Sequence, residues 1–295
     1  MKLLKNCWLL MRPRQWVKNG FVFMGLLFAN EWRQPEMLRR VLLATLAFSL
    51  VASGVYVLND LLDRERDLHH PTKKSRPLAA GQISVTVALL LLALLWIAGG
   101  AVGLWVSRTV LLILLAYVAI NLLYSLGLRQ VVILDVFLIA AGFMLRILAG
   151  TIGVGIAPSQ WLLICGFMVA LFLGFAKRRA ELYALSGETS NHRSVLEHYQ
   201  PVLLDKMIVV TATCVILTYS LFTMSPLTVQ KHHTESLIYT APFVVYGIFR
   251  YIYTLHNQQT GTEPANEIFR DPHILVSIAG WLMVTLWLIS GSGAR

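Results

Sequence analysis

Charged residues are scarce in this chain of 295 residues. They make up 14% of it, against about 25% in a typical soluble domain, while hydrophobic residues make up 57% against about 45–50%. The chain therefore has too few polar residues for a soluble protein of this size, and we expect a polytopic membrane protein. Its apolar segments are continuous and do not alternate as in a membrane β-barrel, which predicts an all-α bundle.

Cysteines and acidic residues are also few. The three cysteines, Cys7, Cys165 and Cys214, show no metal-ligand spacing, so we expect free thiols. With 15 acidic against 25 basic residues, the net charge is +10. In a membrane protein this excess indicates positively charged cytoplasmic loops first, and anionic lipids or phosphate substrates second. We therefore expect no nucleic-acid partner.

Apolar segments of membrane-spanning length recur along the chain and predict about nine transmembrane helices in one membrane-embedded domain, residues 1–295. They lie at 16–30, 41–61, 85–106, 109–128, 131–153, 160–180, 202–224, 237–256 and 273–291. We interpret the first as a membrane helix and not a cleaved signal, because no small-residue cleavage site follows it. Most of the 25 lysines and arginines fall on the side of the N-terminus, which predicts that this side is cytoplasmic.

Three aspartates, Asp60, Asp63 and Asp67, follow one another at the end of the second apolar segment. On one continuous helix, spacings of three and four residues would place them along a single stripe where that helix leaves the bilayer. Carboxylates so placed are costly unless a cation neutralises them, and Mg²⁺ is often held by one or two carboxylates plus substrate phosphates. The sequence therefore predicts a Mg²⁺ site here. Basic residues just downstream, Lys73 and Arg76, could bind the rest of an anionic substrate.

Each of these residues also has a purely structural interpretation. The aspartates could form a solvated helix end paired with Arg64 or Arg66, and Asn59 could be a capping or packing residue. The downstream lysine and arginine could be ordinary cytoplasmic loop charges.

The motif Asn59-Asp60-x-x-Asp63-x-x-x-Asp67 resembles the first aspartate-rich motif of UbiA-type intramembrane prenyltransferases, which are all-helical bundles. Three further motifs, at 12–19, 70–77 and 177–182, are similar to one branch of that superfamily, the decaprenyl-phosphate phosphoribosyltransferases. The resemblance extends from Arg12 to about Tyr199 and weakens over the last three segments.

This resemblance implies Mg²⁺-dependent transfer of a 5-phosphoribosyl group from phosphoribosyl pyrophosphate to a polyprenyl phosphate, in cell wall biogenesis. The active site would face the cytoplasm at a bacterial plasma membrane. The three aspartates would be the catalytic and metal-binding residues. Together with candidates from the residues themselves, the expected substrate-binding residues are Arg14, Lys18, Asn19, Asn59, Lys73, Arg76, Tyr124, Arg146, Lys177, Arg178, Glu181 and Arg193.

Aspartate is absent from the sequence between Lys177 and Gln200. Enzymes of this superfamily that ionise a prenyl diphosphate usually carry a second aspartate-rich motif in the corresponding loop. Here the loop offers mainly lysine and arginine. One acidic cluster combined with a cationic loop suits a donor that carries a pyrophosphate and a separate phosphate, as phosphoribosyl pyrophosphate does.

Several candidates remain open between two roles. Arg146 lies well inside an apolar segment, where an arginine must pair or face a polar cavity, so it is either a phosphate ligand or part of a structural ion pair. Tyr124 could touch the donor or be an interfacial tyrosine. Arg14 and Lys18 flank the first apolar segment, where snorkelling side chains are common.

Two other functions compete with phosphoribosyl transfer. A prenyltransferase acting on an aromatic or other small acceptor is the nearest alternative, and the missing second aspartate motif argues against it. A transporter or channel would place its charges near the midplane of the bilayer, whereas the aspartates lie at one surface. The sequence leaves open whether the protein forms a homo-oligomer in the lipid bilayer.

Overall fold

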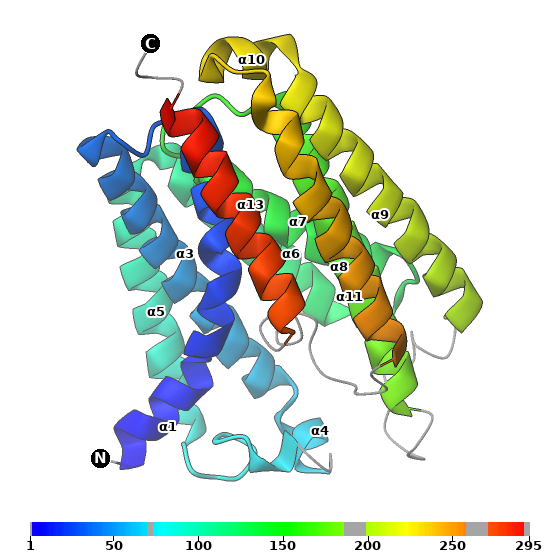
Figure 1. Ribbon diagram of the computed structural model, residues 1–295. Helices are drawn as coiled ribbons and strands as arrows, with labels where there is room; N and C mark the ends of the chain where they lie inside the picture. Colours follow the sequence, from blue (N-terminus) through cyan, green and yellow to red (C-terminus); the bar gives the residue numbers. More distant parts are fainter. Residues whose placement is uncertain (1, 70–72, 186–198, 258–270, 292–295) are drawn as a thin grey trace. The chain divides into compact units, whose positions relative to one another are not determined.

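The computed structural model describes residues 2–69, 73–185, 199–257 and 271–291, and within these ranges every regular element is a helix (Figure 1). Six helices are long and apolar enough to cross a membrane. They are α3 (Pro35–Leu62), α5 (Val85–Val106), α6 (Arg108–Leu126), α8 (Gln160–Leu185), α9 (Pro201–Met224) and α13 (Pro272–Gly291). The expected all-α, multi-pass membrane protein is confirmed, while the number of nine spans and the orientation stay predictions.

The remaining apolar segments form shorter or composite elements. Segment 16–30 forms the end of a 3₁₀ helix, η1 (Pro13–Phe23), and a short α2 (Met24–Ala29). Segment 131–153 contains α7 (Leu134–Ala149), which cannot begin earlier because Ile133 has a left-handed backbone with φ of 71°. Segment 237–256 combines η5 (Ser236–Thr240) with α11 (Ala241–Asn257).

The chain divides into two compact units. Unit 1 comprises Met1–Leu128 and Leu145–Pro158, and unit 2 comprises Arg129–Met144 and Ser159–Arg295. The first part of α7 belongs to unit 2 and its last part to unit 1. The single domain expected from the sequence stays a prediction, and each unit is described separately.

In unit 1, α3 packs tightly against α5, where small residues let the two backbones approach (Figure 1). A Cβ atom on Gly54 would lie 2.3 Å from the indole nitrogen of Trp96, and one on Gly99 would lie 2.7 Å from a methyl of Val51. Trp96 also donates a hydrogen bond of 3.3 Å to the carbonyl of Val51. This contact makes α3 the buried helix of unit 1, whereas Leu90 and other large apolar side chains of α5 stay exposed, as expected for a face in contact with lipid.

The chain before α3 is irregular and lies along it. Helix α1 (Lys2–Met11) ends at Arg12, whose left-handed backbone has φ of 52° and ψ of 59°, and Pro13 then begins η1. From η1, Trp16 donates to the Ser53 hydroxyl at 2.9 Å, and the Asn19 amide donates to the Ser49 hydroxyl at 2.8 Å. These side-chain bonds tie the 3₁₀ helix to α3.

The end of α7 in unit 1 meets this first segment backbone to backbone. A Cβ atom on Gly150 would lie 1.7 Å from the carbonyl oxygen of Val22, and one on Gly25 would lie 2.4 Å from the carbonyl oxygen of Gly150. Only glycine permits such an approach at these two positions.

After α3, the chain forms the short helix α4 (Arg64–Leu68) and a 3₁₀ turn, η2 (Lys73–Ser75), before α5 begins. Ser84 and Ser107 cap α5 and α6 by accepting hydrogen bonds from the N–H groups of Val87 and Val110. A further 3₁₀ turn, η3 (Leu128–Gln130), follows α6.

In unit 2, α8 and α9 run side by side, and so do α11 and α13. The buried core combines Val136 of α7 with Phe172 and Phe175 of α8, Ile208 of α9 and Tyr251 of α11. A short helix, α10 (Pro226–His232), follows α9. This packing holds the beginning of α7 against α8, which becomes important for the charged residues at the end of α8.

Candidate active site

The three aspartates do not lie on one continuous helix. Helix α3 ends at Leu62, Asp63 occupies the junction with φ of −94° and ψ of 5°, and α4 begins at Arg64. The chain bends there although the local hydrogen bonding continues, since Asp63 N–H donates to Asn59 C=O at 2.9 Å and Asp67 N–H donates to Asp63 C=O at 2.8 Å. The prediction of a single stripe along one helix is therefore wrong.

The bend brings two of the aspartates to the same cation. Arg76 donates through one nitrogen, Nη1, to Asp60 Oδ1 at 3.0 Å and to Asp67 Oδ2 at 2.6 Å. Arg12 approaches the same Asp60 oxygen with its Nη2 at 2.5 Å. The carboxylate side chains are only 3% and 4% exposed, whereas the Arg12 and Arg76 side chains are 30% and 27% exposed. We call these four residues the acidic cluster.

The acidic cluster has a donor set that suits a hard divalent cation. Oxygens from Asp60 and Asp67 both touch one nitrogen of Arg76, so they converge on a single point of positive charge. In the described part of the chain, no group of three or more His, Cys, Asp or Glu residues could hold a metal by itself. Two carboxylates suffice for Mg²⁺ when substrate phosphates and water supply the remaining ligands. The residues present therefore fit a metal that is bound together with a phosphorylated substrate.

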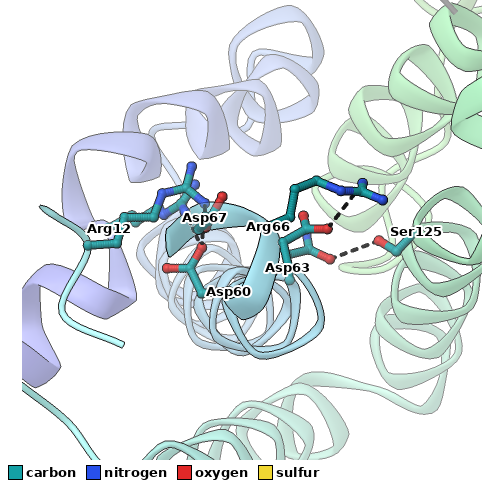
Figure 2. A network of polar contacts seen from close by, with 8 residues as sticks. Arg12, Asp60, Asp63, Arg66, Asp67 and Ser125 are labelled. Atoms are coloured by element: carbon teal, nitrogen blue, oxygen red, sulfur yellow. Dashed lines mark hydrogen bonds and ion pairs between the residues drawn. The ribbon is translucent and has the colours of Figure 1, made fainter. Parts of the chain in front are cut away.

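Asp63 lies apart from this cluster. Its side chain is 26% exposed and lies 3.9 Å from Arg66 of the next turn. Figure 2 shows Arg12, Asp60 and Asp67 grouped together, and Asp63 paired with Arg66 apart from that group. Asn59 accepts a hydrogen bond of 2.8 Å from the Ser125 hydroxyl, which ties the end of α3 to α6.

Arg12 is a residue of this site that the sequence did not single out. It appeared there only as the first residue of a motif, and nothing in the local composition distinguished it from Arg14. The structure separates the two: Arg14 is exposed, whereas Arg12 bonds to Asp60 and lies over the Tyr56 ring with 5.3 Å from its guanidinium carbon to the ring centroid. The signal that could have found Arg12 is its place directly before Pro13, a position where the chain has to leave the preceding helix.

The buried Arg146 belongs to a second polar group within unit 1. Its Nε donates to Asn19 Oδ1 at 2.9 Å and its Nη2 donates to the Tyr117 hydroxyl at 3.1 Å. The guanidinium also lies 4.9 Å and 5.0 Å from the ring centroids of Phe48 and Tyr117, distances at which aromatic faces stabilise a cation. These contacts favour a structural role that holds η1 to α7, and the role of phosphate ligand stays a prediction.

Three further predicted residues, Lys18, Lys73 and Tyr124, belong to unit 1 and are half-buried. All three make polar or ring contacts. Their exposure leaves each side chain partly accessible to a ligand, and their roles stay predictions.

In unit 2, the predicted Arg178 is completely buried at the end of α8. Its Nε lies 3.0 Å from Asp135 Oδ2, and both side chains are 0% exposed. Its Nη1 donates to Glu181 one turn further along α8. The Tyr199 hydroxyl completes the arrangement by donating to Asp135 Oδ1 at 2.7 Å and accepting from Ile133 N–H at 2.7 Å.

This buried network ties three parts of unit 2 together: the start of α7, the end of α8 and the approach to α9. Burial, followed by the hydrogen bond to the Asp135 carboxylate, raises the pKa of Tyr199 well above its usual range. Tyr199 therefore stays a neutral hydrogen-bond donor. Arg178 stabilises the fold of unit 2 through its contacts with Asp135 and Glu181.

The other cations of this region differ in their surroundings. Arg179 bonds to Asp205 of α9 at 2.7 Å and lies 3.9 Å from the centre of the Tyr183 ring, so it too is used within unit 2. Lys177 and Glu181 are half-buried. Arg193, also expected to bind substrate, lies outside the described residues.

Comparison with known proteins relates the chain to one family. Residues 20–270 match the model of the UbiA prenyltransferase family. A decaprenyl-phosphate phosphoribosyltransferase from Mycolicibacterium smegmatis is 30% identical over 282 residues, which cover 92% of this chain and 88% of that protein. The enzyme of the same name from Corynebacterium glutamicum is 33% identical over 82% of this chain and 74% of that protein.

Solved structures support the fold. A UbiA homologue from Archaeoglobus fulgidus bound to GPP and Mg²⁺ superposes with a TM-score of 0.71 at 17% sequence identity, covering 97% of this chain and 99% of that one. A digeranylgeranylglyceryl phosphate synthase structure has a TM-score of 0.66 at 18% identity and covers 99% of each chain. At this level of identity the likeness concerns the arrangement of helices.

Proposed function

Because the chain belongs to the UbiA prenyltransferase family, we propose that it is a membrane transferase that moves a 5-phosphoribosyl group from phosphoribosyl pyrophosphate to a polyprenyl phosphate. The C1–O bond to pyrophosphate breaks, a new C1–O bond to the lipid phosphate forms, and pyrophosphate leaves. The observation that carries this proposal is the acidic cluster, in which two buried carboxylates converge beside two arginines. We place the site at the cytoplasmic face of a bacterial plasma membrane.

The donor's pyrophosphate is the group that suits the acidic cluster. Asp60 and Asp67 would hold Mg²⁺, which when bound supplies charge neutralisation for the leaving pyrophosphate. Arg12 and Arg76 have partly exposed side chains, so their guanidinium groups can turn from the carboxylates to phosphate oxygens. Asp63, at the junction of α3 and α4, would bind the donor less directly, through a water molecule on the metal or through the ribose hydroxyls.

The acceptor needs little activation. A polyprenyl phosphate is already an anionic nucleophile, so no general base is required to generate it. We propose that the substrates are contacted by Lys18, Lys73, Lys177, Glu181 and Arg193. Arg178 would position the end of α8, which carries Lys177 and Glu181. A cation beside each phosphate also lowers the repulsion between two negatively charged reactants.

The experiment is incubation of the purified protein in detergent with ribose-labelled phosphoribosyl pyrophosphate and a polyprenyl phosphate, with Mg²⁺ or with a chelator. We expect label to enter the organic phase only with the metal. Asp60→Asn and Asp67→Asn should lower the rate by roughly 100-fold or more. Glu36→Gln is the matched control, because Glu36 lies at the opposite end of α3 and is 59% exposed.

Wild-type rates in both aspartate variants would refute the assignment of the acidic cluster. Prenyl transfer to an aromatic or other small acceptor is the second candidate, because the superposed Archaeoglobus fulgidus homologue binds GPP. Formation of a prenylated acceptor from labelled prenyl diphosphate, with no transfer of ribose label, would favour that function instead.

A further inference from the structure

Helix α1 has one face in the core of unit 1 and another that is apolar and uncovered. Leu10 is 1% exposed and packs in a cluster with Val57 of α3 and Leu78. On the uncovered side, Leu4 is 76% exposed and Trp8 is 53% exposed. Exposed apolar side chains of this kind are more stable in contact with lipid than in water, so they mark a surface that interacts with a membrane.

The position of α1 along the spans is set by its buried contacts. Val57 lies one turn before Asp60, and the same cluster contains Ile83, just before α5, and Ala88, near the beginning of α5. Helices α3 and α5 are both candidate membrane spans, and they end and begin at this level. Helix α1 therefore packs where two spans leave the bilayer, which is the depth of the lipid headgroups.

The charges on α1 have a single sign. Lys2 and Lys5 are exposed on successive turns, and α1 contains no acidic residue. Lysine beside exposed leucine and tryptophan is the composition of helices that lie in a membrane interface and attract anionic lipids.

We propose that α1 is an interfacial helix: Leu4, Trp8 and Leu9 enter the boundary between headgroups and acyl chains, and Lys2 and Lys5 bind the phosphates of anionic lipid headgroups. The occupant of the uncovered face is thus the bilayer itself. This inference does not depend on the transferase activity. It assigns a surface role to residues that no step of the proposed reaction uses.

A depth measurement on the full-length protein tests the apolar part. In a background with all three cysteines replaced by alanine, Leu4→Cys carries a nitroxide label, and its accessibility to oxygen and to a water-soluble nickel chelate is measured in lipid nanodiscs. Ile97→Cys, on the exposed face of α5 and twelve residues from its start, serves as the reference for a label deep in the lipid, and Gln82→Cys in an exposed turn serves as the reference for a label in water. We expect the Leu4 label to lie between them, about 5–10 Å below the headgroups.

Two results would overturn this part of the proposal. A Leu4 label as accessible to the nickel chelate as the Gln82 label would place α1 in water. Protection from both reagents would mean that protein, such as a second copy of the chain, covers the face.

The lysines are tested separately by lipid charge. In nanodiscs of phosphatidylcholine with a quarter phosphatidylglycerol, the Leu4 label should lie deeper than in phosphatidylcholine alone. Lys2→Gln combined with Lys5→Gln should abolish that difference, while Lys231→Gln, a control lysine on α10, should leave it intact. If the Leu4 label lies at the same depth in both lipid mixtures while Lys2 and Lys5 are unchanged, the headgroup contact is refuted.

Discussion

Arg178 and Asp135 form an ion pair in which neither side chain reaches solvent, and the pair joins the end of α8 to the beginning of α7. The Tyr199 hydroxyl and Glu181 complete its surroundings. A buried pair of this kind is sensitive to the loss of one partner, because the remaining charge is left in a medium of low polarity.

Removing one member of this pair should therefore destabilise the protein strongly. Arg178→Met or Asp135→Leu alone should each cost about 3–5 kcal/mol of unfolding free energy. The double variant should lose much less than the sum, since neither of the two fully buried charges remains and Glu181, which also loses Arg178 as a partner, is 27% exposed. Thermal unfolding of the detergent-solubilised protein measures this, and simple additivity of the two losses would argue against direct pairing.

The competition between Arg76 and a metal ion can be measured without any substrate. Arg76 occupies the point where oxygens of Asp60 and Asp67 converge, so Arg76→Met should strengthen Mg²⁺ binding on the order of tenfold or more. The readout is the Mg²⁺ concentration at which the melting temperature of the full-length protein rises. Arg66→Met is the matched control, because Arg66 is 71% exposed and lies beside Asp63. Unchanged Mg²⁺ binding in Arg76→Met would place the metal elsewhere.

Gly150 should not tolerate even alanine. The added Cβ would lie 1.7 Å from the Val22 carbonyl oxygen, so backbone would have to move, at a cost of at least about 3 kcal/mol. Gly100→Ala is the control, because there the nearest atom is a Leu111 methyl at 3.8 Å, and alanine in a helix interior should gain about 0.5–1 kcal/mol. Melting temperatures that shift equally in the two variants would contradict the close approach of Val22 and Gly150.

Asp271 should make stability depend on pH in the acid range. Burial acts to raise its pKa, but hydrogen bonds from Arg250 and from the N–H groups of Ile274 and His273 outweigh it, and the pKa lies below its usual value. The stability that the ionised carboxylate contributes is therefore present above about pH 4, the unfolded value, and is lost as pH falls through the lowered value.

The variant Asp271→Asn isolates this effect. It should melt below the wild type at pH 7, and the difference between the two should narrow as the pH is lowered below about 4. A difference that stays constant down to pH 3 would show that the charge of Asp271 does not stabilise α13.

Much of the helical framework could be predicted from the sequence, because long continuous apolar segments leave few alternatives in a membrane. The segment at 85–106 corresponds closely to α5, and the segment at 202–224 to α9. The beginning of α7 could not be predicted, because the left-handed backbone of Ile133 is imposed by its surroundings, and isoleucine gives no local signal for it.

The candidate site was predictable in its residue types and less so in its geometry. Asp60, Asp67 and Arg76 were expected to lie together, and they do. The bend at Asp63 has neither glycine nor proline to mark it, so the sequence suggested one straight stripe. The contact of Arg12 with Asp60 joins residues 48 positions apart, and no local pattern encodes such a distance.

The 3₁₀ form of η1 has a consequence for how the first segment finds its place on α3. A 3₁₀ helix advances about 6 Å in three residues, and an α-helix advances about 6 Å in four. Trp16 and Asn19 are three residues apart and bond to Ser53 and Ser49, which are four residues apart. The two bonding residues of η1 are therefore as far apart along their helix as the two serines are along α3, and the two helices run in opposite directions. A slip of one residue would break both hydrogen bonds, and a change of η1 to an α-helix would shorten the advance between Trp16 and Asn19 to about 4.5 Å, so the two bonds could not form together.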